Sequence, residues 1–106
     1  MKEGEIYIVP FTSSIGHEFQ KIRPVIVLKQ SSYIFTCVPL TSNISNKLKG
    51  DIMIYKNNIN NLLKDSLVKI RYISTFDVLR IHKYIGKVDT NIMKDIQQSI
   101  RSYLTL

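Results

Sequence analysis

The sequence predicts a mainly β domain with one C-terminal helix. Residues 25–28 form an unbroken apolar run, mostly β-branched, that is too short for a helix and is typical of a strand buried on both faces. Further short apolar runs follow, separated by turn residues, and only the tail has a helical period. We therefore expect one domain over residues 1–106, a small and strongly bent antiparallel sheet or barrel against which the helix packs.

Composition favours a compact protein with an anionic partner. The chain has 15 Lys and Arg against 8 Asp and Glu, a formal charge of +7, and 44% hydrophobic residues. The hydrophobic share is that of a soluble globular protein, and the charge favours nucleic acid or an acidic protein as partner. No apolar run approaches membrane-spanning length and residues 1–4 do not resemble a signal peptide, so we expect a cytoplasmic protein with no membrane partner.

Cysteine and histidine usage points away from disulfide and metal chemistry. Cys37 is the single cysteine and lies in an apolar run, so we expect a small buried hydrophobe in a reducing compartment. His17 and His82 are isolated, without the spacing of a metal site. We expect no metal and no cofactor.

The first half of the chain predicts three strands. Residues 4–9 form the first, which Pro10 ends, and residues 11–20 form a loop that is long for so small a domain. The buried strand at 24–28 and a turn at 29–33 follow. Residues 34–40 form a third strand, which must end, bulge or lie on an edge at Pro39 because proline cannot donate a ladder hydrogen bond.

The second half predicts three more strands and the helix. We expect strands at 51–56, 67–73 and 84–88, a loop with a helical turn at 57–63, and a short helical turn at 78–80 capped by residues 74–77. Asp89 or Thr90 can cap the C-terminal helix. Its apolar stripe either packs on the sheet, which we expect, or forms a face for a partner. The stripe consists of Ile92, Met93, Ile96, Ile100, Tyr103 and Leu104.

A charged loop before the buried strand is the first candidate site. Gly16, His17, Glu18 and Lys21 lead to Arg23 and Pro24. Pro24 fixes its own φ and favours an extended Arg23, which places this cation at the mouth of a rigid strand. With a histidine and a carboxylate on the loop before it, the arginine suits a phosphate; the alternative is an ordinary charged loop with a surface ion pair.

These motifs together resemble the MazF/PemK/Kid toxins. The resemblance rests on residues 4–6, 16–18, 23–25, 38–42, 65–66, 75–77 and 85–88 in that order, and covers about residues 4–104. It implies an SH3-like small barrel of the PemK/MazF/CcdB toxin type and a symmetric homodimer. It further implies a metal-independent endoribonuclease of a type II toxin–antitoxin pair, which cuts single-stranded RNA at short motifs and is covered by a cognate antitoxin.

The resemblance assigns roles to residues of this chain. Its arginine and strand-end threonine fall on Arg23 and Thr41, which carry catalysis or phosphate binding in many members, and its loop histidine and glutamate fall on His17 and Glu18. Its acidic residue after the fifth strand falls on Asp77. The chain departs from the pattern at Phe19, where many members have glutamine, and at Ser74, where many have the arginine proposed as general acid in Kid-like members.

Metal-free RNA cleavage needs a base for the ribose 2′-hydroxyl, stabilisation of the phosphorane, and an acid for the leaving 5′-oxygen. Arg23 suits the phosphorane, and the Thr41 hydroxyl can donate to the same phosphate or bond its own turn. His17 suits acid or base chemistry, and Glu18 or Asp77 suits the base, although Glu18 can pair with Lys21 or Arg23 and Asp77 can cap a helical turn.

Four residues are candidates for contact with RNA: Phe19, Lys21, Ser42 and Arg71. Phe19 can stack on a base or fill a dimer interface, and the cations can attract the backbone, as can Lys47 and Lys49.

Two other functions stay open. One is a family member that binds RNA or an antitoxin without cleavage, which the Ser74 departure favours. The other is a CcdB-like gyrase poison; those toxins rely on a tryptophan near the C-terminus, and this chain has no Trp.

Overall fold

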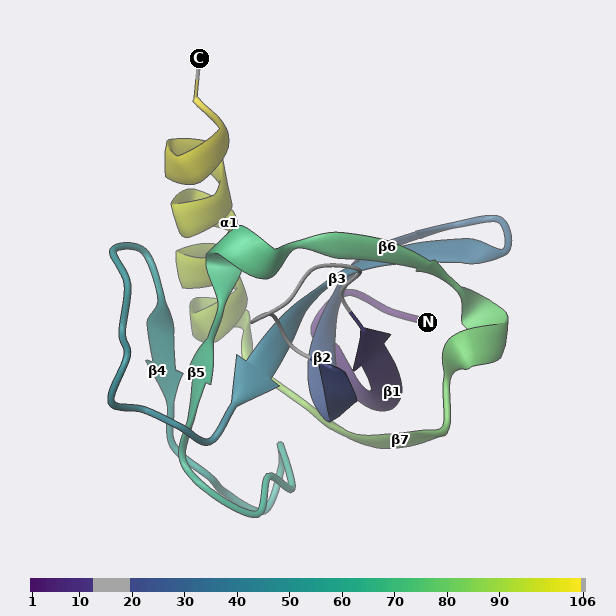
Figure 1. The fold of residues 1–106 in the computed structure, drawn as a ribbon, viewed down its shortest axis with the longest axis horizontal. Coiled ribbons are helices and arrows are strands. Elements are labelled where there is room, and N and C mark those ends of the chain that lie inside the picture. The colour runs from purple at the N-terminus through teal and green to yellow at the C-terminus, as the bar shows by residue number, and fades with distance from the viewer. Residues whose placement is uncertain (13–19, 106) are drawn as a thin grey trace.

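The computed structural model describes residues 1–12 and 20–105, with residues 11, 12, 20 and 21 described by their backbone alone. The described chain is a strongly bent antiparallel sheet with one C-terminal helix (Figure 1). Its strands are β1 (Glu5–Thr12), β2 (Gln20–Ser31), β3 (Ile34–Thr41), β4 (Ile52–Ile54), β5 (Ser66–Val68), β6 (Ser74–Asp77) and β7 (Lys83–Lys87). The helix is α1 (Thr90–Leu104), and two single 3₁₀ turns are η1 (Ile70–Tyr72) and η2 (Val78–Arg80).

Strand β3 is the centre of the sheet. The strands follow the order β4-β5-β3-β2-β1-β7, and β6 pairs with the same side of β3 as β5 does. β6 takes residues 34–37 of β3, whereas β5 takes Leu40 and Thr41. The two ends of β3 therefore serve two different parts of the molecule.

All three prolines lie inside strands, and Pro10 and Pro39 do so against expectation or at an edge. The expectation that Pro10 ends the first strand is wrong: β1 continues to Thr12, and Pro10 pairs with Ile22. β7 accompanies β1 only as far as Ile8, so a residue without an N–H is tolerated beyond that point. Pro39 pairs with Val25 and lies between the segments that pair with β6 and β5, where β3 is an edge on that side.

The expected strand at 67–73 is wrong beyond Val68, and the expected cap at 74–77 is confirmed at Asp77 alone. β5 ends at Val68, and the chain turns through η1, which buries Ile70. Residues 74–77 instead form β6, because β3 offers an open edge with which their backbone can pair from Ser74 to Asp77. Asp77 caps the following turn itself: its side chain accepts a hydrogen bond of 2.8 Å from the Leu79 N–H.

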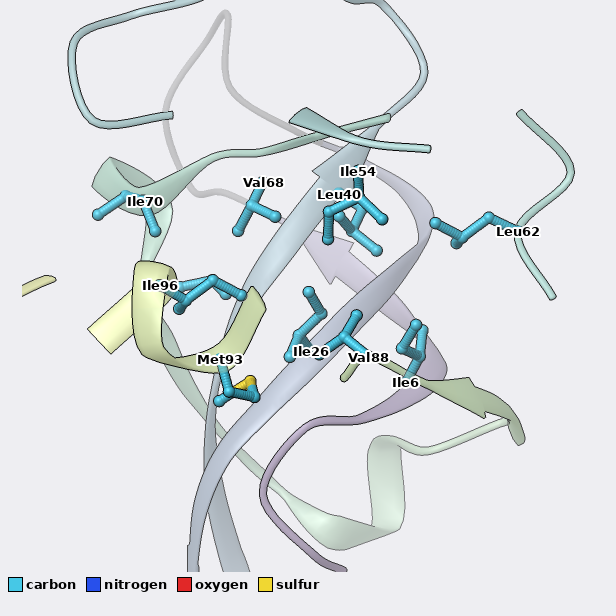
Figure 2. Packing of buried hydrophobic residues seen from close by; sticks show 11 residues of the cluster. Ile6, Ile26, Leu40, Ile54, Leu62, Val68, Ile70, Val88, Met93 and Ile96 are labelled. Carbon is cyan, nitrogen blue, oxygen red and sulfur yellow. The ribbon is translucent and has the colours of Figure 1, made fainter. Parts of the chain in front are cut away.

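The core lies on both faces of β2, as its unbroken apolar run predicts. Ile26 packs in one cluster with residues of β1, β3, β4, η1 and α1, which Figure 2 shows from close by. Val25 and Val27 pack in a second cluster with Val9, Phe35 and Cys37. Cys37 is fully buried, as expected, and this burial raises the pKa of its thiol to about 12.

The helix begins after Asp89, whose carboxylate accepts a 2.8 Å hydrogen bond from the Ile92 N–H. Met93 and Ile96 are buried against the sheet (Figure 2), so the stripe packs as expected. The final turn departs from that expectation, since Tyr103 and Leu104 are 47% and 54% exposed. No helix of the described chain has the length and apolar character needed to cross a membrane.

Candidate anion-binding site

A pocket of about 680 Å³ lies where β2 and β3 carry the predicted arginine and threonine. Its walls come from β1, β2, β3, β5 and β7, from the start of the loop after β3, and from the loop between β4 and β5. Arg23, Thr41 and Ser42 all line it. The structure thus brings together three of the site residues predicted from the sequence, although 18 positions of chain separate Arg23 from Thr41.

Arg23 sits within β2 rather than at its mouth. It pairs with Val9 of β1, and the β2–β3 register that joins Val25 to Pro39 places Arg23 opposite Thr41 when continued by two residues. The residue is half-buried, and desolvation lowers the pKa of its guanidinium below its usual value. A guanidinium keeps its charge at neutral pH after such a shift, so the pocket contains a fixed cation.

Thr41 ends β3 and is only 8% exposed. Its Oγ1 accepts a 3.2 Å hydrogen bond from the Asn43 N–H, so the turn role considered from the sequence is present in the structure. This bond uses the hydroxyl as an acceptor. Because a hydroxyl also carries a proton, Thr41 can still donate one hydrogen bond to an anion in the pocket.

Two lysines that were not singled out from the sequence also line the pocket. Lys64 comes from the loop before β5, and Lys83 begins β7. Lys83 and Pro24 both pair with Ile8, which puts the lysine in the same row of the sheet. No local pattern could have found them, because only the folding of distant segments brings either lysine to the pocket that Arg23 lines.

The charged residues that line the pocket are all positive in the described part of the chain. Among its described lining residues there are three cations, Arg23, Lys64 and Lys83, and no carboxylate. The described part of the chain also has no group of three or more His, Cys, Asp or Glu able to hold a metal ion. The arrangement can bind an anion such as a phosphate through the guanidinium of Arg23 and the hydroxyl of Thr41, and the two lysines add positive charge to the same pocket.

Two predicted site residues lie elsewhere. Asp77 pairs with Ile34, at the opposite end of β3 from Thr41, which is about 23 Å for seven residues at a strand rise of about 3.3 Å. Its carboxylate caps η2. Arg71 lies in η1 rather than on a strand, is exposed, and has its guanidinium carbon 5.6 Å from the centre of the Tyr103 ring. It borders a separate hollow of about 400 Å³.

For the remaining predicted site residues, the structure does not describe the side chains. His17, Glu18 and Phe19 lie outside the described residues. Lys21 is described by its backbone, which pairs with Phe11 in the β1–β2 ladder.

Comparison with known proteins gives one family and a consistent set of folds. The family model of the PemK-like, MazF-like toxins of type II toxin–antitoxin systems matches residues 2–104. No curated protein matches the chain in sequence.

Solved structures of low sequence identity share the fold. MazF from Deinococcus radiodurans has a TM-score of 0.83 and 15% identity, covering 100% of this chain and 97% of that one. Toxin MazF-mt6 of Mycobacterium tuberculosis has a TM-score of 0.76 and 20% identity, covering 96% and 97%. An endoribonuclease from Mycobacterial species, solved with its cognate antitoxin, has a TM-score of 0.69 and 16% identity, covering 98% and 92%. The predicted fold class is confirmed.

Proposed function

The chain belongs to the PemK-like, MazF-like toxins of type II toxin–antitoxin systems, and from this premise we propose that it is a metal-independent endoribonuclease that cleaves single-stranded RNA at short sequence motifs. The observation that supports this activity best is the pocket that joins Arg23 to Thr41, with two lysines and no described carboxylate on its walls. Such a pocket attracts the phosphate that has to react.

The chemistry follows from the pocket and from RNA itself. The ribose 2′-oxygen attacks the adjacent phosphorus, the bond from phosphorus to the 5′-oxygen breaks, and a 2′,3′-cyclic phosphate and a free 5′-hydroxyl result. Negative charge builds up on the non-bridging oxygens in the transition state. Arg23 donates two hydrogen bonds to these oxygens in one plane, and Thr41 donates its hydroxyl proton to the same phosphate.

The proton transfers fall to the loop before β2 in this proposal. The described residues that line the pocket include no His, Asp or Glu, and Asp77 caps η2 at the other end of β3. His17 and Glu18 are therefore our candidates for acid and base, an assignment that rests on the family resemblance and on the near-neutral pKa of histidine.

The proposal extends to partners. An endoribonuclease that shares this fold was solved in complex with its cognate antitoxin. We propose that this chain likewise has a cognate antitoxin and that it acts as a homodimer. Expression without the antitoxin should then inhibit growth, and co-expression should restore it.

The decisive experiment is cleavage of a long defined RNA in EDTA by the wild type, Arg23→Ala and Thr41→Ala. Arg101→Ala is the matched control, because Arg101 is an exposed arginine of α1 that does not line the pocket. We expect discrete cuts with cyclic phosphate ends, lost in Arg23→Ala and retained in Arg101→Ala. Cuts that survive both pocket substitutions would place the chemistry elsewhere.

Binding without cleavage is the second candidate. It is favoured by the absence of a group that titrates near neutral pH among the described lining residues, and by Ser74 where many relatives have arginine. It predicts that the protein retains RNA on a filter but leaves it intact at any protein excess.

A further inference from the structure

The loop between β4 and β5, residues 55–65, is held in place by hydrogen bonds of its own asparagines. Asn57 Oδ1 accepts hydrogen bonds of 2.8 Å from the N–H groups of Ile59 and Asn60. Asn60, only 2% exposed, accepts from the Asn57 and Leu62 N–H groups through Oδ1 and donates through Nδ2 to the Tyr55 carbonyl. A loop with this many internal bonds has one conformation before any ligand arrives, so a ligand does not have to order it.

The same loop also contacts β7 through hydrogen bonds and the core through Leu62. The Asn61 side chain donates a 2.7 Å bond to the Ile85 carbonyl, and the Lys87 N–H donates to the Ile59 carbonyl. Contact is so close at Gly86 that a methyl group there would lie 2.5 Å from the Ile59 carbonyl oxygen. Leu62 points inward toward Leu40 and Ile54 (Figure 2). The loop is therefore a fixed wall of the pocket.

What this wall presents to the pocket is an exposed leucine and a lysine. Leu63 is 91% exposed, Lys64 follows it, and both line the pocket. Ile22 of β2, 59% exposed, lines the same space. Apolar side chains left in water beside cations suit a ligand that has apolar faces and negative charges, as a single-stranded nucleic acid has.

Lys83 completes the arrangement from β7. It lies two strands from Pro24 in one row of the sheet, about 10 Å at a strand spacing of about 4.8 Å. A backbone separation of about 10 Å leaves room for a second phosphate beside the one proposed for Arg23 and Thr41.

We propose that Leu63, Lys64 and Lys83 form a subsite for the RNA segment that flanks the reacting phosphate, the two lysines binding a neighbouring phosphate and Leu63 packing against a base. The choice of RNA rests on the proposed function. The subsite contributes to substrate affinity and not to the chemical step, because none of its groups contacts the reacting atoms.

The first test measures binding of a fully 2′-O-methylated single-stranded RNA, which has no nucleophile, as a function of salt. Lys64→Ala/Lys83→Ala is compared with Lys29→Ala/Lys94→Ala, which removes the same charge from two exposed lysines that do not line the pocket. We expect the pocket variant to bind about tenfold more weakly, with the slope of log K against log salt smaller by about 1.4, and the control to match wild type. Equal binding by the two variants overturns the subsite.

The second test separates the subsite from the proposed activity. In cleavage assays Leu63→Ala and the pocket double variant should raise KM about five- to tenfold and leave kcat within about twofold. If the wild type cleaves RNA but these variants keep its KM, the subsite is wrong and the ribonuclease stands. If the wild type binds the methylated RNA through the two lysines yet cleaves nothing, the ribonuclease is wrong and the subsite stands.

Discussion

Lys69 donates a hydrogen bond to the Asp51 carboxylate, forming an ion pair buried between β5 and the segment before β4. Both residues are only 5% exposed. The ammonium also donates to the Asn46 carbonyl at 2.9 Å, and Asp51 Oδ2 accepts from the Leu48 N–H at 2.8 Å. The pair thus fastens the loop that follows Thr41 to the sheet, so it holds one wall of the pocket in place.

Removal of one partner of this pair should be costly. In Lys69→Met the Asp51 carboxylate stays buried, and its Oδ1 already has no hydrogen-bond partner among the described residues. We expect a loss of about 3–5 kcal/mol in the free energy of unfolding, and a smaller loss in Lys69→Met/Asp51→Leu than the two single losses added. Urea unfolding measures both, with the exposed Lys94→Met as control. A Lys69→Met protein as stable as this control would contradict the argument.

The close contact at Gly86 gives a second stability prediction. In Gly86→Ala the new methyl group would meet the backbone oxygens of Ile59 and Asn60 at 2.5 and 2.6 Å, and backbone cannot move aside as a side-chain end can. We expect a loss of about 3 kcal/mol in the free energy of unfolding, together with weaker RNA binding because the pocket wall shifts.

Gly50→Ala is the comparison for Gly86→Ala. Gly50 has a φ of +92°, and a Cβ there would meet only Ser99 Oγ at 4.0 Å, an ordinary contact. Its substitution therefore introduces backbone strain alone, about 1–2 kcal/mol, and should leave RNA binding unchanged. If both substitutions affect RNA binding equally, the contact between β7 and the loop at Ile59 and Asn60 does not determine the shape of the pocket.

Local patterns were sufficient to predict much of the fold. The run at residues 25–28 correctly predicted a strand buried on both faces, and Asp89 correctly marked the start of the helix, since each signal lies within a few residues of its effect. The predicted strand at residues 67–73 was wrong for the opposite reason, because the signal that decides where it ends is not local. An apolar pattern such as Leu67, Val68, Ile70 and Ile73 fits a strand or a strand followed by a 3₁₀ turn, and only the open edge of β3 decides which forms.

The residues of the candidate site likewise fall into those that local sequence could predict and those that it could not. Arg23 and Thr41 could be predicted as lining residues because Arg23 directly precedes Pro24 and a buried strand, because Thr41 ends a strand, and because the family resemblance marks both. Lys64 and Lys83 could not be, since lysines on exposed segments are common and the register through Ile8 that brings Lys83 to the pocket is not visible in the chain. Asp77 shows the converse: its cap role was visible locally, and the structure contains it.

Tyr7 gives a prediction on alkaline pH. Burial, and secondly its hydrogen bond to Glu5, raise the pKa of Tyr7 from 10.0 to about 12. Because the pKa is higher in the folded state, the stability contributed by neutral Tyr7 is fully present below about pH 10 and is lost as pH rises toward about 12. Unfolding measured from pH 8 to about 12 should therefore show a steeper loss in wild type than in Tyr7→Phe. Parallel curves for the two proteins would show that Tyr7 titrates normally.

The hydroxyl of Thr41 can be tested apart from its turn. Thr41→Val keeps the shape of the side chain but removes the proton that the phosphate would accept, so we expect kcat for RNA cleavage to fall about 100-fold, whereas Thr41→Ser should stay within a few-fold of wild type. Valine also leaves the Asn43 N–H without its acceptor, which should lower the free energy of unfolding by only about 1 kcal/mol. Because that loss leaves nearly all molecules folded, it cannot account for a 100-fold drop. If Thr41→Val cleaves RNA as fast as Thr41→Ser, the hydroxyl serves the turn at Asn43 alone, and Arg23 stabilises the phosphorane without it.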